Sequence, residues 1–301
     1  NQKCVAVGRL LPLAMLIVLA GCAPPGPRAL LEGEQLIKQG KFTEALEPLR
    51  AASVLLPRNP QAWNHLGLAS HNAGRQNDAL QAYRKALELD VNLAPARFNL
   101  GCLLLEIGQP AAAANEFSAY TMAQPRSVDG WLKRARAELL ARQFEAASRS
   151  CKSALALNPK QPEVWNTLGI VELFRNRVTD SFQAFNSGVQ QDSTYAPALF
   201  NAALVSQHYL PRRPVDHRPF ALQKYKDFLA LNPQVEQLEA IKEAVAALEE
   251  EISPHRPAPK PVAVPLITAP PAPPVVVAVA VVPKVEPVPP APPPKPTPPP
   301  P

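Results

Sequence analysis

Histidine and cysteine are the side chains best suited to catalysis or metal binding, and their spacing argues against both. His65 and His71 lie six residues apart, so they do not share a helical face as metal ligands four residues apart would. His208, His217 and His255 have no carboxylate or cysteine at the spacing of a catalytic triad. The four cysteines include no Cys-x-x-Cys pair, which leaves neither a zinc site nor a disulfide framework. We therefore predict no enzymatic activity, metal, cofactor or small-molecule substrate, and we expect the histidines to lie at the surface.

Cys22 is the residue whose surroundings predict a chemical modification. Lys3 and Arg9 precede an apolar stretch from residue 10 to 20, the order found in an export signal. That stretch is too short to cross a bilayer, which takes about 20 residues. The sequence Leu-Ala-Gly-Cys at residues 19–22 resembles the lipobox of bacterial lipoproteins, in which the cysteine thiol is joined to diacylglycerol before cleavage. An ordinary secretory signal that contains a cysteine is the alternative.

The lipobox resemblance implies a place in the cell. Residues 1–21 are the expected signal peptide and residues 22–25 a short linker that follows the lipidated Cys22. The mature protein is expected in the bacterial cell envelope, anchored by lipid and facing the periplasm. Ala23 stands where an aspartate tends to retain lipoproteins at the inner membrane, so the outer membrane is favoured.

A period of 34 residues runs through the middle of the chain. Trp131 and Trp165 lie one period apart, and Trp63 lies two periods before Trp131. Small residues hold the eighth position of each unit, namely Gly33, Gly67, Gly101, Ala135, Gly169 and Ala203. Small residues at the eighth and twentieth positions let two antiparallel helices approach closely, while a larger residue at position 24 fills the space beside them. Glycine at position 15 ends the first helix, and proline at position 32 ends the second.

This pattern resembles the tetratricopeptide repeat over residues 26–233. The resemblance implies an all-α fold, a right-handed superhelix of six helical hairpins at residues 26–59, 60–93, 94–127, 128–161, 162–195 and 196–233. Arg142 and Asn176 replace the turn glycine in units four and five. Unit six carries a proline- and arginine-rich insertion at 210–219, interpreted as a tolerated loop or as a docking point for an acidic partner. Apolar residues at helical spacing between 235 and 252 predict a capping helix, placed at 234–252.

In this family the first helix of each hairpin lines a concave face. Asparagine side chains spaced along it can clamp the backbone of an extended peptide, because each amide has a donor and an acceptor. Phenylalanines would hold apolar anchors, with a lysine and an arginine attracting an acidic group between them. The predicted groove residues are Asn64, His65, Phe98, Asn99, Lys133, Arg136, Asn166, Phe200 and Asn201. Alternatively, these side chains are solvated or contact the neighbouring turn. No unit has asparagine at position 9, so a two-carboxylate clamp for chaperone tails is not expected.

The C-terminal segment differs in composition from the repeats. It holds 21 of the 38 prolines, so residues 253–301 are expected to be a disordered spacer. As polyproline II, such a segment reaches on the order of 150 Å. Its composition resembles the proline-rich spacers of TonB-type envelope proteins. The formal net charge of +6 is concentrated in the two ends of the chain, which argues against nucleic-acid binding by the nearly neutral middle.

These patterns predict a membrane-anchored scaffold or adaptor that binds extended segments of other envelope proteins and catalyses nothing. It is similar to tetratricopeptide lipoproteins that assist type IV pilus assembly or recruit peptidoglycan hydrolases, and the sequence does not choose between those roles. One alternative is a structural tether between membrane and peptidoglycan through the tail. Another is the N-terminal fragment of a larger protein with a further domain.

Overall fold

The computed structural model describes residues 24–211, 214–236 and 238–253. The predicted signal peptide, Cys22 and nearly all of the predicted tail lie outside these residues, as do Arg212 and Arg213 of the insertion. The described residues divide into two compact units, with the division between Leu103 and Leu104. Unit 1 therefore covers residues 24–103, and unit 2 covers the described residues from 104 to 253. No helix among the described residues has the length and apolar character needed to cross a bilayer.

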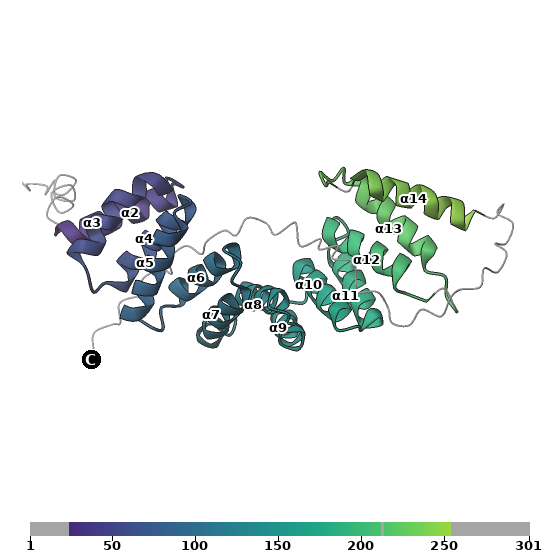
Figure 1. Cartoon of the computed structure of the whole chain (residues 1–301), viewed down its shortest axis with the longest axis horizontal. Helices are drawn as coiled ribbons and strands as arrows, with labels where there is room; N and C mark the ends of the chain where they lie inside the picture. Colours follow the sequence, from purple (N-terminus) through teal and green to yellow (C-terminus); the bar gives the residue numbers. More distant parts are fainter. Residues whose placement is uncertain (1–23, 212–213, 237, 254–301) are drawn as a thin grey trace, which may run out of the picture. The chain divides into compact units, whose positions relative to one another are not determined.

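The described residues form α-helices and no β-strand (Figure 1). In chain order they are α2 (Pro25–Lys38), α3 (Phe42–Leu55), α4 (Pro60–Asn72), α5 (Gln76–Leu89), α6 (Ala94–Glu106), α7 (Pro110–Ala123), α8 (Val128–Leu140), α9 (Phe144–Leu157), α10 (Pro162–Phe174), α11 (Val178–Gln191), α12 (Ala196–His208), α13 (Arg218–Ala230) and α14 (Leu238–Ile252). The even-numbered helices from α2 to α12 are first helices of hairpins, and the odd-numbered helices are second helices. The all-α fold of six hairpins and a final helix is confirmed.

Local sequence sets where the first helices begin. Pro60 and Pro162 stand at the first position of α4 and α10, where a missing N–H leaves no hydrogen bond unmade. The Asn59 side chain caps α4 by accepting a hydrogen bond from the Gln61 N–H at 2.9 Å. Ser127 caps α8 in the same way, accepting from the Gly130 N–H at 3.0 Å.

The turn inside each of the first five hairpins contains one residue in the left-handed region. Gly40, Gly74 and Gly108 adopt φ angles of +74°, +76° and +73° there. Arg142 and Asn176 adopt +60° and +58° at the equivalent positions, so the turn persists without glycine. A left-handed conformation costs a residue with a side chain roughly 1–2 kcal/mol, which the packing of the two helices must offset.

Close packing explains the small residue at the eighth position. A Cβ atom built on Gly67 would lie 2.6 Å from the Tyr83 ring, and one on Gly169 would lie 2.5 Å from the Phe185 ring. Both rings are fully buried. The fourth repeat instead places Ala135 in one buried cluster with Cys151, whose side chain is smaller than either ring. The eighth and twenty-fourth positions therefore fit each other by size.

The tryptophans join α4, α8 and α10 to the end of the preceding helix. The indole Nε1–H donates to a proline carbonyl six residues earlier, in the pairs Trp63 to Pro57 at 3.1 Å, Trp131 to Pro125 at 2.9 Å and Trp165 to Pro159 at 2.7 Å. The preceding helices α3, α7 and α9 end two residues before these prolines. The proline carbonyl, left free because the helix has ended, thus receives a donor from the next repeat.

The final helix covers the end of unit 2. Ile241 and Leu248 of α14 are buried in one cluster with Tyr225 and Phe228 of α13. The helix begins at Leu238, so Val235 packs against this cluster from outside the helix instead of from its first turn. Glu239, Glu243 and Glu250 of α14 are exposed, whereas Glu249 and Glu251 form ion pairs with Lys226 and Arg218 of α13 at 2.7 and 3.3 Å.

Candidate functional site

The first helices of unit 2 contact one another in a row. α8 contacts α10 and α10 contacts α12, in addition to the second helices with which they form hairpins. In the described part of unit 2 the second helices make no comparable contacts with one another. In unit 1, α2 contacts α4 in the same way. The side of each row turned away from the second helices is called the first-helix face below.

Two asparagine pairs lie on first helices, one pair in each unit. The Asn201 side-chain N–H donates to Asn166 Oδ1 at 2.8 Å, and the Asn99 side-chain N–H donates to Asn64 Oδ1 at 3.3 Å. Each bond joins position 6 of one first helix to position 5 of the preceding one. The two pairs are three repeats apart. All four residues belong to the predicted groove, but the bonds between them were not predicted, although the 35-residue spacing recurs in both pairs and carries that signal.

Most of the predicted groove residues are buried. The buried ones are Asn64, His65, Phe98, Asn99, Lys133, Asn166 and Asn201, whereas Arg136 and Phe200 are half-buried. The Phe200 ring packs against Tyr225 and Phe228, with ring centroids 6.1 and 5.5 Å apart, so it contributes to the core of the last hairpin. A ligand would meet only the accessible edges of these side chains. Their role in binding a peptide stays a prediction.

His65 corrects the expectation that the histidines are surface residues. Its side chain is 2% exposed, and Nδ1 lies 3.3 Å from Glu34 Oε1. Burial, together with the nearby Lys38 ammonium, lowers the pKa of His65 to about 4. Burial raises the pKa of Glu34, against the influence of Lys38. His65 is therefore neutral at pH 7, because taking its charged form out of water is costly.

Lys133 and Arg136 bring positive charge to the first-helix face of unit 2. Lys133 is 8% exposed, and neither cation has an ion-pair partner among the described residues. The pKa of Tyr195 is raised to about 12 by burial and by Glu163, while Arg136 acts in the opposite direction. Arg136 and Glu163 therefore each lie close enough to Tyr195 to act on its hydroxyl.

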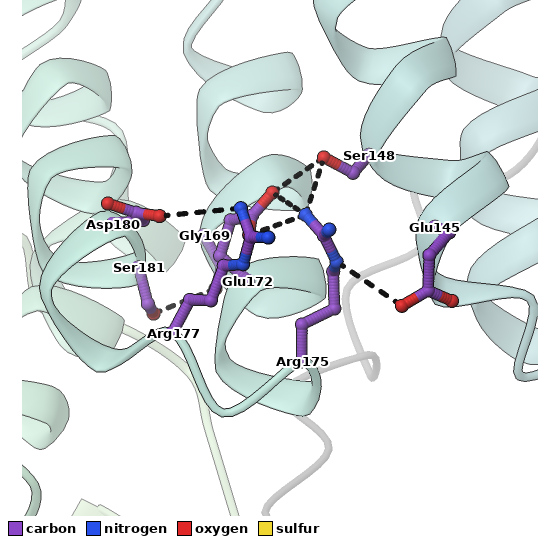
Figure 2. A network of polar contacts seen from close by, with 8 residues as sticks. All are labelled: Glu145, Ser148, Gly169, Glu172, Arg175, Arg177, Asp180 and Ser181. Carbon is purple, nitrogen blue, oxygen red and sulfur yellow. Dashed lines mark hydrogen bonds and ion pairs between the residues drawn. The ribbon is translucent and has the colours of Figure 1, made fainter.

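Behind this face, buried glutamates hold helix α9 between its neighbours. Glu172 of α10 accepts hydrogen bonds from the Ser148 hydroxyl at 2.6 Å and from Arg175 Nη1 at 2.9 Å (Figure 2). Glu138 of α8 accepts from the Ser150 hydroxyl at 2.6 Å. Both serines belong to α9, so the two carboxylates fix its register against α8 and α10. These residues were not predicted from the sequence, although both glutamates stand at position 11 of consecutive repeats.

Cysteines and metal ligands form no further site in the described part of the chain. Cys102 and Cys151 are buried and form no disulfide with each other. Burial raises the pKa of the Cys151 thiol far above its usual value, and Glu138 adds to this effect. No group of three or more histidine, cysteine, aspartate or glutamate side chains in the described ranges is arranged to hold a metal ion.

Comparison with known proteins identifies the repeat. A tetratricopeptide repeat model matches residues 30–92, 98–162 and 133–196, which is more than half of the chain. This chain belongs to the tetratricopeptide repeat family. Repeats of this family are protein-interaction modules, and a protein-binding scaffold is consistent with the fold.

Curated relatives share the repeat region. Protein FlbA of Caulobacter vibrioides is 30% identical over 142 residues, 47% of this chain and 24% of FlbA. The peroxisomal targeting signal receptor of Candida albicans is 34% identical over 90 residues, 30% of this chain and 15% of the receptor. The chain thus aligns with less than a quarter of the length of either relative.

Solved structures share the fold at low sequence identity. PilW, described as a widely conserved type IV pilus biogenesis factor, matches with a TM-score of 0.59 and 16% identity over 73% of this chain and all of PilW. PilF of Pseudomonas aeruginosa matches with a TM-score of 0.58 and 18% identity over 73% of this chain and 97% of PilF. YrrB, described as having an unusual peptide-binding site, matches with a TM-score of 0.53 and 18% identity over 65% of this chain and 97% of YrrB.

Proposed function

We propose that this chain is a lipid-anchored scaffold of the bacterial cell envelope that binds extended segments of partner proteins on its first-helix face and catalyses nothing. The observation that carries the proposal is the asparagine pair, which recurs three repeats apart with the same partners and the same register. Helix packing alone does not require a buried amide at these positions, since apolar side chains of similar size would fill them.

An asparagine pair suits the backbone of an extended peptide. The hydrogen bond between the two side-chain amides orients both of them. It leaves other donors and acceptors of the pair available to a ligand. In unit 1, Asn99 Oδ1 is buried and has no hydrogen-bond partner in the described part of the chain. An unmet buried acceptor costs about 1–3 kcal/mol, a cost that an apolar side chain at this position would not carry.

The envelope location rests on the residues around Cys22. Two acyl chains on this residue would hold the protein firmly, since each buried CH₂ contributes about 0.8 kcal/mol and a single chain gives only reversible attachment. PilW, described as a type IV pilus biogenesis factor, shares its fold with the repeats and lends support to a role in assembling envelope structures. We place the protein at the outer membrane, facing the periplasm. Recruitment of peptidoglycan hydrolases is the other role open to such a scaffold.

The binding role is tested by capturing the intact lipoprotein from its own envelope after chemical cross-linking. A variant with Asn166→Ser and Asn201→Ser loses the amide pair and keeps small polar side chains. It should lose most cross-links from α10 and α12 to other proteins while its helical circular dichroism is unchanged. Asn115→Ser, at an exposed position on α7, is the matched control and should keep the cross-links. Undiminished cross-links in the double variant would exclude this face as the binding site.

The anchor is tested separately. Cys22→Ala should abolish incorporation of a radioactive fatty acid and release the protein from the membrane fraction. Labelling that persists in this variant would contradict the lipid anchor, whatever the capture experiment shows.

A further inference from the structure

The first hairpin exposes two adjacent apolar side chains at the end of α3. Val54 is 76% exposed and Leu55 is 49% exposed. Helix packing does not require an apolar residue at the position of Val54, because the next repeat has Glu88 there, in an ion pair with Lys85 at 2.8 Å. Singly exposed aliphatic residues are common on protein surfaces, so the surroundings of this pair decide what it contacts.

The start of α2 lies beside the end of α3. A Cβ atom built on Gly26, the second residue of α2, would lie 3.2 Å from Leu55 Cβ. Cys22 precedes Pro25, the first residue of α2, by three residues, and three residues of extended chain span about 11 Å at most. A lipid on Cys22 would therefore hold this end of the hairpin, with Val54 and Leu55, at the membrane surface.

The charges at this end of the hairpin are positive. Arg28 of α2 and Arg58, three residues after α3, are exposed, and the sequence has no aspartate or glutamate at residues 22–31 or 48–77. Leu31, one turn after Arg28, adds another exposed apolar side chain. A negatively charged surface attracts exposed arginines within a Debye length, about 8 Å at physiological ionic strength. Arginine beside exposed apolar side chains suits a surface that contacts anionic lipid headgroups.

We propose that this end of the first hairpin docks on the anionic phospholipid surface of the membrane that holds Cys22. Val54 and Leu55 enter the headgroup layer, and Arg28 and Arg58 bind lipid phosphates. Arginine suits this role because its planar guanidinium can donate two parallel hydrogen bonds to a phosphate. The inference rests on the lipid anchor of the proposed function. The acyl chains hold the protein at one residue, whereas this contact also fixes which side of unit 1 faces the lipid.

The third repeat offers a matched control. Met122 stands there at the position of Val54 and is 74% exposed, and Arg126 stands at the position of Arg58. The two sites have similar side chains but differ in their distance along the chain from Cys22. A contact that the anchor positions should therefore involve Val54 and not Met122.

The test places a polarity-sensitive fluorophore on the intact acylated protein, reconstituted on vesicles of phosphatidylcholine mixed with phosphatidylglycerol. A label introduced through Val54→Cys should shift its emission to the blue, and a label introduced through Met122→Cys should not. Arg28→Gln plus Arg58→Gln should lower the ratio of embedded to water-exposed label at residue 54 on the order of tenfold. Arg126→Gln plus Lys160→Gln, at exposed positions of unit 2, should leave that ratio unchanged.

The outcomes separate this contact from the anchor. All the substituted residues are exposed, so helical circular dichroism should match that of the wild type. A label at residue 54 that reports water, or an equal blue shift at residue 122, overturns the inference while the protein still floats with the vesicles. A blue shift that survives Arg28→Gln plus Arg58→Gln, or that is as large on phosphatidylcholine alone, also overturns it. A wild-type protein that does not float with the vesicles contradicts the lipid anchor, and the inference falls with it.

Discussion

Unit 1 and unit 2 build the same hairpin from partly different turn residues and surround the same asparagine pair with different charges. Gly40 and Gly74 make the turns of unit 1, whereas unit 2 uses Gly108 in its first turn and Arg142 and Asn176 in the next two, all with positive φ. The packing of two helices fixes the backbone firmly enough to force a non-glycine residue into the left-handed region. Positions that contact no neighbouring helix are free to diverge, and the charges of the first-helix face have done so.

The buried glutamates make the largest difference between the units. Position 11 holds Glu138 and Glu172 in the fourth and fifth repeats, both in unit 2, whereas unit 1 has Leu36 and Ser70 there and no glutamate. Glu172→Ala would leave Arg175 and Ser148 without their acceptor, and we expect it to destabilise unit 2 by about 3–5 kcal/mol. Hydrogen exchange should show lost protection in α9 and α10 and unchanged protection in α2 and α3. Glu145→Ala, which removes only an exposed ion pair 3.6 Å from Arg175, should cost less than about 1 kcal/mol.

Unit 1 should respond to acid through His65. Its pKa is lowered from 6.5 to about 4 in the folded protein, so the unfolded chain binds more protons between these two values. Stability is therefore fully present above pH 6.5 and is lost as the pH falls towards 4, by up to about 3 kcal/mol. Thr167 holds the equivalent position in unit 2, which should lack this response. Urea unfolding at several pH values checks the slope, and His65→Asn should remove it. A slope that the variant retains would assign the response to another group.

The glycine at position 8 should behave alike in both units. Gly67→Ala and Gly169→Ala each push a Cβ atom into a buried ring, and we expect each to cost about 1–3 kcal/mol in urea unfolding. Tyr83→Leu and Phe185→Leu, which make room, should relieve the cost when combined with the respective alanine. If either single alanine variant were as stable as the wild type, the fit at positions 8 and 24 would not set the helix separation.

Replacing the turn residues of unit 2 by glycine should change the stability least. Arg142→Gly should stabilise unit 2 by about 1 kcal/mol, because glycine reaches the left-handed region without strain. Asn176→Gly should gain less, since asparagine tolerates this conformation better than arginine. Thermal unfolding measures both. Destabilisation by Arg142→Gly would indicate that the arginine side chain makes a contact that offsets its strain.

The repeat frame could be predicted because it depends on residues that recur along the chain. Tryptophan, glycine and alanine at fixed intervals predicted the helical hairpins, and the structure confirms them. The bonds between repeats could not be predicted so directly. The Asn99–Asn64 bond and the Ser148–Glu172 bond join residues 35 and 24 positions apart, and they depend on how one hairpin is rotated against the next. The burial of His65 depends on the same rotation.

The most direct test of the scaffold is site-specific photo-cross-linking in living cells. A photoreactive amino acid at Leu204, half-buried on the first-helix face of α12, is compared with one at Gln183, exposed on α11. The account predicts cross-links from Leu204 to a continuous segment of one or a few envelope proteins and none from Gln183. Equal cross-linking from both positions, or none from Leu204, would contradict binding on the first-helix face.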